Sequence, residues 1–345
     1  MTGGTVARQT QRSRPTTRAG RTVIIAWALL LSGGAVTILP MTLANRLLVL
    51  PRGGYAPPAK LPPFDSSWAR QGRVLAPTVG WESTSVQEPD VTFADAIFKM
   101  WGKGGWTTTG LGYYTSTDGR TWTASGSNPV LGTSPEIAQP AIYWDGTQYR
   151  VYYNSGGDSD PNTPRYATSP DGVTWTVQGA GTFVTNPGAI TQWGNRHVWK
   201  EGASWYMLQE ARSGGRWRMF YATSSDGNSW TLGNGSAALS TLELSGSHNV
   251  GGPTMMETPK VGSTYHLWFH TGTGSNSDLY HSTSTDRITW DTPNLVLTHS
   301  GTGDEVDQVA DPSIVIVGST AYLFYAGVDN TAQTGRILLL TAPAT

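Results

Sequence analysis

The chain has 345 residues, enough for one large all-β domain or two ordinary domains. Its 42 glycines, 15 tryptophans and 14 tyrosines, against 14% charged residues, favour turns and aromatic-rich strands over helices. There is no cysteine, which excludes disulfides and thiolate metal sites. All 24 acidic residues lie at or after Asp65, where 15 basic residues remain, so this part carries a formal charge of −9. That charge argues against nucleic acid as the main partner.

The first 64 residues predict export of the remainder. Five arginines within residues 1–22 precede Val23–Ala44, a run of 22 uncharged residues that is long enough to span a bilayer. The basic flank favours a cytoplasmic tail, with the following residues outside the cell. A cleaved signal peptide with a weak site at Thr42 and Ala44 is the alternative, which would give a secreted protein. Residues 45–64 contain five prolines and predict an extended linker.

A nonapeptide recurs four times in residues 65–345. The copies are "TSTDGRTWT" from Thr115, "TSPDGVTWT" from Thr168, "TSSDGNSWT" from Thr223 and the divergent "TSTDRITWD" from Thr283. The Asp-Gly pair is a hairpin-turn signal, and the flanking Thr, Ser and Trp suit strands. Steps of 53, 55 and 60 residues are typical of a β-propeller with four strands per blade. We therefore assign these turns a structural role and no catalytic one.

The last repeat unit predicts how the ring closes. Two strand-like runs precede each hairpin, and a fifth pair, Pro312–Gly327, is followed by a single further strand. This unit therefore lacks its outermost strand. Ser67–Thr78 resembles the segments that end the other units, so we expect it to complete the last blade. The sequence predicts an all-β, five-bladed propeller whose closure removes exposed sheet edges.

At this level the chain resembles a known group. "VQEPDV", "FKMWG", "GYYTSTDGRTWT" and "VADPSIV" are similar to segments of the five-bladed propeller superfamily that includes glycoside hydrolase families 43, 32, 62, 68 and 130. The resemblance extends over about residues 68–343 and is more specific for the fold than for the substrate. Sialidase propellers are the alternative, but their Asp-box has a further residue between Asp and Gly. The resemblance implies hydrolysis of arabinose-, xylose- or fructose-type glycans.

The expected site is one mouth of the central channel. Starts of innermost strands and ends of second strands share that mouth in a propeller, and such a concave place is the default binding site. Five strand starts are aligned there, Glu88, Gln139, Asn195, Thr258 (with Glu257 beside it) and Asp311. Five strand ends accompany them, Lys103, Asn154, Glu210, His270 and Asp329.

The resemblance implies a base or nucleophile on blade one, a second carboxylate on blade two and an acid on blade three. Glu88, or its neighbour Asp90, occupies the first position. Gln139 and Asn195 occupy the others and cannot titrate, so Glu210 is the nearest carboxylate for the acid. Because glycoside hydrolysis ordinarily needs two carboxylates, we expect Glu88 with Glu210.

Glu257 and Asp311 are the alternatives to Glu210, although both also suit a structural place near a turn or a blade start. Substrate contacts are expected from polar and aromatic side chains at the mouth, namely Gln139, Asn154, Trp106, Trp193, His197, Trp217 and His270. Packing between blades is the alternative for the tryptophans. The histidines match no metal-ligand spacing, so no cofactor is expected. The alternative is a single ion such as calcium, bound in the channel through His197.

Two functions follow as hypotheses. The first is an exported glycoside hydrolase with Glu88 or Asp90 as base or nucleophile and Glu210 as proton donor. The second is a membrane-tethered propeller that binds a glycan or a protein and has lost catalysis. Gln139 and Asn195 favour the second, whereas the number of other carboxylates favours the first. We expect the hydrolase, with a carbohydrate partner, an N-terminal membrane contact and no nucleic acid.

Overall fold

The computed structural model describes residues 67–344, except 79, 108, 133–135, 157–161, 179–189, 233–238, 245–247, 262 and the side chains of 257–261. The predicted tail, membrane or signal segment and linker, residues 1–64, lie outside this part. Within the described residues, no helix has the length and apolar character needed to cross a membrane.

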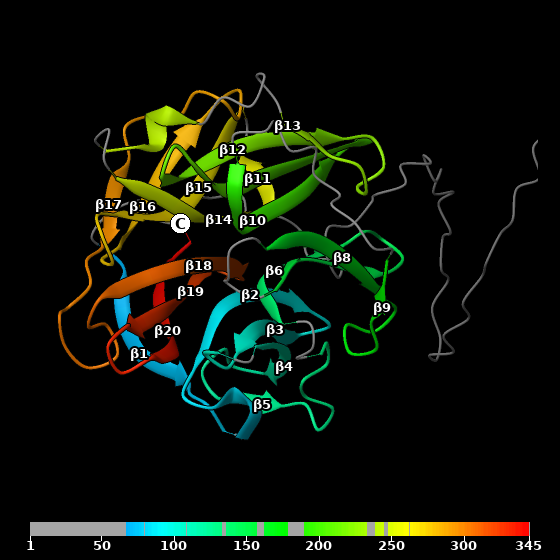
Figure 1. The fold of residues 1–345 in the computed structure, drawn as a ribbon, viewed down its shortest axis with the longest axis vertical. Helices are drawn as coiled ribbons and strands as arrows, with labels where there is room; N and C mark the ends of the chain where they lie inside the picture. Colours follow the sequence, from blue (N-terminus) through cyan, green and yellow to red (C-terminus); the bar gives the residue numbers. More distant parts are fainter. Residues whose placement is uncertain are drawn as a thin grey trace, which may run out of the picture. The chain divides into compact units, whose positions relative to one another are not determined.

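Five four-stranded antiparallel sheets form the blades of a propeller (Figure 1). Blade one consists of β2 (Val86–Ala94), β3 (Ile97–Gly104), β4 (Gly110–Ser116) and β5 (Thr123–Ala124). Blade two consists of β6 (Ile137–Trp144), β7 (Tyr149–Ser155), β8 (Thr163–Ser169) and β9 (Thr176–Val177). Blade three consists of β10 (Ile190–Glu201), β11 (Ser204–Ser213), β12 (Arg216–Ser224) and β13 (Thr231–Leu232).

Blade four consists of β14 (Asn249–Val261), β15 (Thr264–Gly272), β16 (Asp278–Ser284) and β17 (Asn294–Leu297). Blade five consists of β18 (Gln308–Val317), β19 (Thr320–Asp329), β20 (Thr334–Pro343) and β1 (Ala69–Leu75). β1 pairs antiparallel with β20, from Ala69 opposite Thr341 to Leu75 opposite Ile337. The predicted completion of the last blade by the N-terminal strand is therefore confirmed. Two short 3-10 turns, Gly80–Glu82 and Ser240–Leu242, complete the described elements.

The core lies between the blades. Five clusters of buried apolar side chains each combine residues from two neighbouring blades. Trp101 of blade one, for example, is fully buried beside Tyr149 and Val151 of blade two. Burial of apolar surface between sheets thus stabilises the ring as a whole.

The repeated nonapeptides lock neighbouring blades together. In the first copy, Asp118 Oδ1 accepts hydrogen bonds of 2.8 Å from the backbone N–H groups of Arg120 and Thr121. These bonds lower the pKa of Asp118 to about 2, so the turn carboxylate is ionised and already paired. In the second copy, the Gly172 carbonyl accepts a 2.8 Å hydrogen bond from Trp101 Nε1 of the preceding blade. The predicted structural role of these turns is confirmed.

Replacing Gly172 by alanine should destabilise the protein. Gly172 has φ of +78°, and a Cβ there would lie 2.5 Å from Trp101 Cζ2. Backbone strain and overpacking together should lower the free energy of unfolding by roughly 2–5 kcal/mol. Gly202→Ala is the matched control, because Gly202 also has a positive φ, +59°, with nothing within 4 Å of a Cβ. If denaturant unfolding shows the same loss of unfolding free energy for Gly172→Ala and Gly202→Ala, the close contact between Gly172 and Trp101 has no effect on stability, which would contradict this prediction.

A buried histidine pair in blade four predicts acid sensitivity. His266 Nδ1 and His281 Nε2 are 3.2 Å apart, and both side chains are buried. Burial lowers the pKa of His266 to about 4; burial and then the charge of His266 lower that of His281 to about 3. Between about pH 3 and pH 6.5 the unfolded protein therefore binds more protons, so stability is full above pH 6.5 and is lost as the pH falls. The melting temperature should decline below pH 6.5 less steeply in the double variant His266→Gln, His281→Gln, and parallel curves would contradict this.

Candidate functional site

The same irregularity in every blade builds the mouth of the channel. In each innermost strand, two residues stand opposite one residue of the second strand, a β-bulge that bends the strand and re-aims side chains. The register places five residues first in these bulges, Glu88, Gln139, Gly194, Gly252 and Asp311. Glu88, Gln139 and Asp311 have φ of 55°, 54° and 49°. Such left-handed conformations of non-glycine residues are costly and cluster at functional sites.

This register corrects two strand starts. Gly194, rather than Asn195, corresponds to Glu88 in blade three. In blade four, Gly252–Pro253 takes the place predicted for Thr258, because β14 contains two residue-Pro pairs and its pairing with β15 selects the first. Glu257 therefore lies farther along β14, and its side chain is outside the described part.

The second strands need a similar correction. Lys103, Asn154 and His270 stand at one level, each paired with the residue just before a bulge. Ala211 and Ala326 hold this level in blades three and five, where Glu210 and Asp329 were predicted. Glu210 instead lies opposite the bulge of blade three, which still directs its carboxylate into the mouth.

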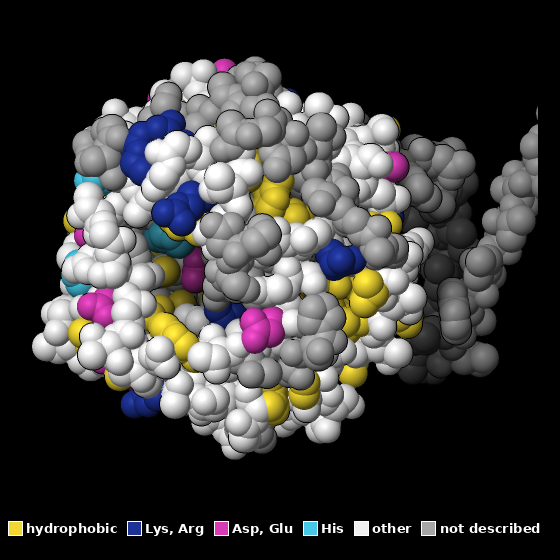
Figure 2. Space-filling model, viewed as in Figure 1, with side chains coloured by type: hydrophobic (Ala, Val, Ile, Leu, Met, Phe, Trp, Pro, Cys, Tyr) yellow, Lys and Arg dark blue, Asp and Glu magenta, His cyan; other side chains and the backbone are white. Residues whose placement is uncertain are grey.

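A funnel of about 430 Å³ opens at this mouth. Figure 2 shows it as a hollow near the middle of the face, with acidic and histidine side chains inside. Nine residues predicted at this mouth line it, Glu88, Lys103, Trp106, Gln139, Asn195, Glu210, Trp217, His270 and Asp311. Sequence reasoning missed a polar wall formed by Gln192, Asn249, Ser275, Asn276, Ser277, Gln308 and Asn330. The Gly/Ser/Asn-rich stretch after β15 was the available signal for part of this wall.

Glu210 lies at the base of the funnel in a backbone cradle. Its Oε2 accepts hydrogen bonds from the N–H groups of Gly252 at 3.0 Å and Asn195 at 3.1 Å. Gly194 and Gly251 leave room for the carboxylate, since a Cβ on either would overlap it. Burial raises the pKa of Glu210; the nearby His270 opposes this rise and the charge of Asp311 adds to it. A proton is thus retained on Glu210 at a higher pH than on an exposed glutamate.

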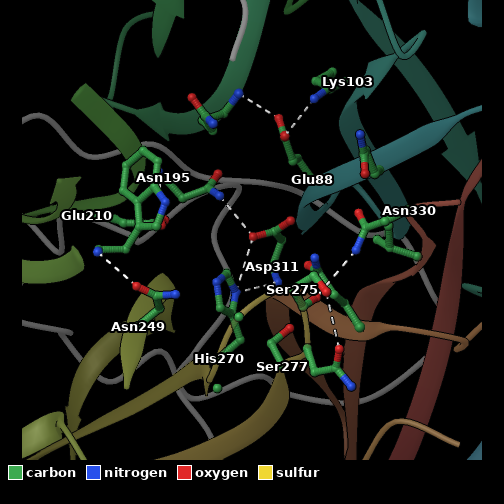
Figure 3. A pocket seen from close by; sticks show the side chains of 18 of the residues that line it. Glu88, Lys103, Asn195, Glu210, Asn249, His270, Ser275, Ser277, Asp311 and Asn330 are labelled. Carbon is green, nitrogen blue, oxygen red and sulfur yellow. Dashed lines mark hydrogen bonds and ion pairs between the residues drawn. The ribbon is translucent and has the colours of Figure 1, made fainter. Parts of the chain in front are cut away.

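Asp311 is held next to Glu210 by shared neighbours (Figure 3). Asn195 Nδ2 donates a 2.8 Å hydrogen bond to Asp311 Oδ1, while the Asn195 backbone N–H contacts Glu210. His270 Nδ1 lies 3.1 Å from the backbone nitrogen of Asp311 and 3.4 Å from Asp311 Oδ1. Burial alone would lower the pKa of His270, but the hydrogen bond and charge of Asp311, with the charge of Glu210, raise it.

Glu88 has a different environment. Its Oε1 lies 3.0 Å from Lys103 Nζ, and both side chains are buried. Its Oε2 accepts a 2.6 Å hydrogen bond from the backbone N–H of Gln139 (Figure 3). The Glu88 charge is therefore compensated by the protein, which makes this carboxylate less available as a base or nucleophile than Asp311.

Two predicted substrate contacts lie beneath the funnel floor. Asn154 is fully buried and donates to Gln139 Oε1 at 2.5 Å and to the Trp193 carbonyl at 2.8 Å. Trp193 is 5% exposed and packs in the cluster between blades two and three. Arg196, also buried, donates to Asn154 Oδ1 and to the Gly194 carbonyl. Asn154 and Trp193 therefore support the floor of the funnel. The side chains that line the funnel at these two bulges are Gln139 of blade two and Glu210 of blade three.

Asp90 and His197 line the narrow lower channel. The cavity there is about 20 Å³, room for about one water molecule, and four bulge prolines surround it. Asp90 Oδ2 accepts a 2.5 Å hydrogen bond from the Ile142 N–H of the next blade. Among the described residues, no group of three or more His, Cys, Asp or Glu side chains is arranged to hold a metal ion.

Sequence comparison yields a partial likeness. No protein-family model matches the sequence. Uncharacterized proteins from two strains of Mycobacterium tuberculosis are 31% identical over 100 residues, which is 27% of this chain and 33% of theirs. The matched region thus spans about a third of the length of those relatives.

Solved structures show the fold class. BT0996, solved as an RGII complex, matches with a TM-score of 0.63 and 15% identity over 82% of this protein and 92% of that one. The catalytic domain of a Coprinopsis cinerea family-62 α-L-arabinofuranosidase matches with a TM-score of 0.58 and 15% identity, over 83% of this protein and 98% of that domain. A Bombyx mori family-32 β-fructofuranosidase matches with a TM-score of 0.59 and 13% identity, over 80% of this protein and 63% of that one. The protein has the five-bladed propeller fold found in these glycoside hydrolases, and identities this low show the fold alone.

Proposed function

We propose that the protein is an exported glycoside hydrolase and that Glu210 and Asp311 carry the reaction. The observation that supports this most strongly is the pair itself. Glu210 is a buried carboxyl group with a raised pKa, and it shares Asn195 and His270 with a second carboxylate at the base of an open polar funnel. Glycoside hydrolysis needs two such groups with different protonation.

In this proposal Glu210 is the proton donor. Its Oε2 is occupied by two backbone N–H groups, so Oε1 is the atom that carries the proton toward the leaving oxygen. Asp311, oriented by Asn195 Nδ2, acts on the anomeric carbon directly or through a water molecule. Glu88, predicted from sequence for this second role, is paired with Lys103 and supports the site instead.

The proposed substrate is an arabinose-, xylose- or fructose-type glycan. Trp106 and Trp217 lie on the funnel wall, where indole rings can stack on sugar faces, and the amide and hydroxyl groups that also line the funnel suit sugar hydroxyls. The names of the arabinofuranosidase and fructofuranosidase that share the fold agree with this class. Export, with a membrane anchor or a cleaved leader, rests on the sequence of residues 1–44.

The test is turnover by the full-length protein of phenyl α-L-arabinofuranoside, phenyl β-D-xyloside and phenyl β-D-fructofuranoside, whose leaving group needs a proton to depart. Glu210→Gln and Asp311→Asn should each remove activity on whichever substrate the wild type cleaves. Glu82→Gln is the matched control, since Glu82 is a buried carboxylate that accepts a 2.6 Å bond from Tyr114 OH and does not line the funnel. Full activity in Glu210→Gln, at unchanged melting temperature, would exclude this residue as the donor.

One observation favours the second candidate function, a glycan- or protein-binding propeller without catalysis. The hydrolase resemblance implies acids on blades one to three, yet Glu88 is neutralised by Lys103 and the other bulges present Gln139 and Gly194. That function predicts binding in the funnel that survives Glu210→Gln and Asp311→Asn, with no product from any substrate.

A further inference from the structure

A second set of equivalent positions lies on the propeller face opposite the funnel. In each of the first three blades, one residue of the second strand pairs with the first threonine of the nonapeptide: Lys99, Arg150 and Tyr206. Lys99 and Arg150 each contact an aromatic residue at the start of the second strand of the following blade, Tyr149 and Trp205. Tyr206 and the equivalent Tyr265 of blade four both contact Arg287. These three junctions can therefore be compared within one molecule.

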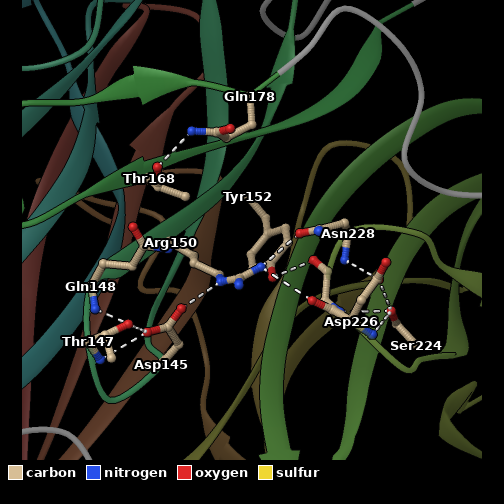
Figure 4. A network of polar contacts seen from close by, with 11 residues as sticks. Asp145, Thr147, Gln148, Arg150, Tyr152, Thr168, Gln178, Ser224, Asp226 and Asn228 are labelled. Carbon is tan, nitrogen blue, oxygen red and sulfur yellow. Dashed lines mark hydrogen bonds and ion pairs between the residues drawn. The ribbon is translucent and has the colours of Figure 1, made fainter.

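The junction of blades two and three is filled by an arginine (Figure 4). The Arg150 guanidinium lies 4.9 Å over the Trp205 ring. Its Nε donates to Asp145 Oδ2 at 2.9 Å, and Nη1 donates to Asn228 Oδ1 at 2.8 Å. Stacking and paired hydrogen bonds together occupy the space between the two blades.

The junction of blades three and four is filled from the other side. Arg287 stands where the other nonapeptides have glycine, with φ of 72°. Its guanidinium lies 4.3 Å over Tyr206 and 5.2 Å over Tyr265, and its Nη1 is 3.4 Å from Glu201 Oε2. The position of Arg287 explains why the fourth nonapeptide diverges. Arg287 fills the space between blades three and four, as Arg150 fills the space between blades two and three.

At the junction of blades one and two, the shorter Lys99 leaves an opening. Lys99 Nζ reaches Tyr149 OH and Asp95 Oδ2, both at 3.3 Å. A cavity of about 300 Å³ remains, which we call the junction cleft; it is lined by Thr92, Ala94, Asp95, Lys99, Trp144, Tyr149, Pro170 and Asp171. A volume of this size is at the lower end for small-molecule sites.

The chemistry of the junction cleft is that of a ligand site. Trp144 is half-buried, with its ring centroid 4.7 Å from that of Tyr149, and no hydrogen bond among the described residues uses its indole N–H. Asp95 is 77% exposed at its side chain and offers acceptor oxygens, while Lys99 offers a donor. Two carboxylates, Asp95 and Asp171, outweigh one ammonium, which disfavours an anionic ligand.

We propose that the junction cleft binds one neutral sugar residue of a glycan, stacked on Trp144 and hydrogen-bonded to Asp95 and Lys99. A neutral polyol satisfies both the donors and the acceptor and meets no repulsion from Lys99, as a second cation would. Because the cleft and the funnel lie on opposite faces, this is a separate binding site. It shares the ligand class of the proposed function but requires no turnover in the funnel.

The experiment is calorimetric titration of the full-length protein with xylotetraose, arabinotetraose and an inulin-type fructotetraose. Lys99→Arg reproduces the arginine-filled junction, so it should keep the melting temperature while lowering affinity at the cleft at least tenfold. Trp144→Ala should do the same by removing the stacking surface. Lys200→Arg is the matched control, because Lys200 lies over Trp205 at a junction that Arg150 already fills. The affinity of this variant for the tetrasaccharides should equal that of the wild type.

Glu210→Gln and Asp311→Asn separate this proposal from the proposed function. Binding that is lost in Lys99→Arg and kept in both funnel variants supports the cleft, even if no substrate is turned over. Aryl glycoside turnover should be unchanged in Lys99→Arg. Wild-type affinity and stoichiometry for all three tetrasaccharides in both Lys99→Arg and Trp144→Ala, or no binding of any of them outside the funnel, would overturn the proposal.

Discussion

Replacing Glu210 by glutamine should lower kcat on a natural glycan by roughly 10²- to 10⁴-fold, the usual contribution of a positioned acid. Glutamine keeps the size of the side chain and can still accept the Gly252 and Asn195 hydrogen bonds through its carbonyl oxygen, but it carries no transferable proton. The loss should depend on the leaving group. A dinitrophenyl glycoside, whose leaving group departs without protonation, should be cleaved nearly as fast by the variant as by the wild type.

The pH profile gives a second readout of the same residue. Because burial and then Asp311 raise the pKa of Glu210, the wild type should remain active to a higher pH than an exposed glutamate would allow. Activity should fall as the pH rises through the pKa of Glu210, and this alkaline limb should be absent in Glu210→Gln acting on the dinitrophenyl substrate. An equal loss on both types of leaving group would indicate a structural role.

Replacing Lys103 by methionine should have the largest effect on stability. It leaves the Glu88 carboxylate buried without its 3.0 Å cation, and breaking a buried pair on one side costs about 3–5 kcal/mol. The double variant Lys103→Met, Glu88→Gln removes both charges and should recover most of the loss. Denaturant unfolding of the wild type, each single variant and the double variant measures this coupling.

The same variants test the assignment of Glu88. If Glu88 is the base or nucleophile, as the sequence predicts, the double variant should be inactive whatever its stability. If Glu88 and Lys103 support the site, the double variant should fold and retain turnover. An inactive, well-folded double variant would therefore return the second catalytic role to Glu88.

The blade pattern was predictable because it depends on local signals. Asp118 and its equivalents mark turns through hydrogen bonds to the backbone of the same turn. Counting strand-like runs in the last repeat unit gave three, so its outer strand had to come from elsewhere in the chain. The bulges were not predictable in register, since Gly252–Pro253 and Thr258–Pro259 have the same local pattern. Only pairing with β15, a tertiary property, separates them.

The candidate site was predictable in part for a similar reason. Glu210 was recognised as a funnel carboxylate from its place near the end of a strand, although the bulge shifts it by one position. The neutralisation of Glu88 by Lys103 depends on side chains of two strands meeting in a buried place, and the spacing of the residues does not encode it. The junction cleft is lined by side chains of two neighbouring blades, and local sequence patterns do not encode how these side chains fill the space between blades.

The most direct test of hydrolysis by Glu210 and Asp311 is to measure product release and equilibrium binding on the same arabinose-, xylose- and fructose-type glycans with one preparation of the full-length protein. If the protein is a glycoside hydrolase with this pair, the wild type releases sugar from at least one of them, and the double variant Glu210→Gln, Asp311→Asn binds this glycan and releases none. Binding in the funnel without release by the wild type, or release that persists in the double variant, would contradict it.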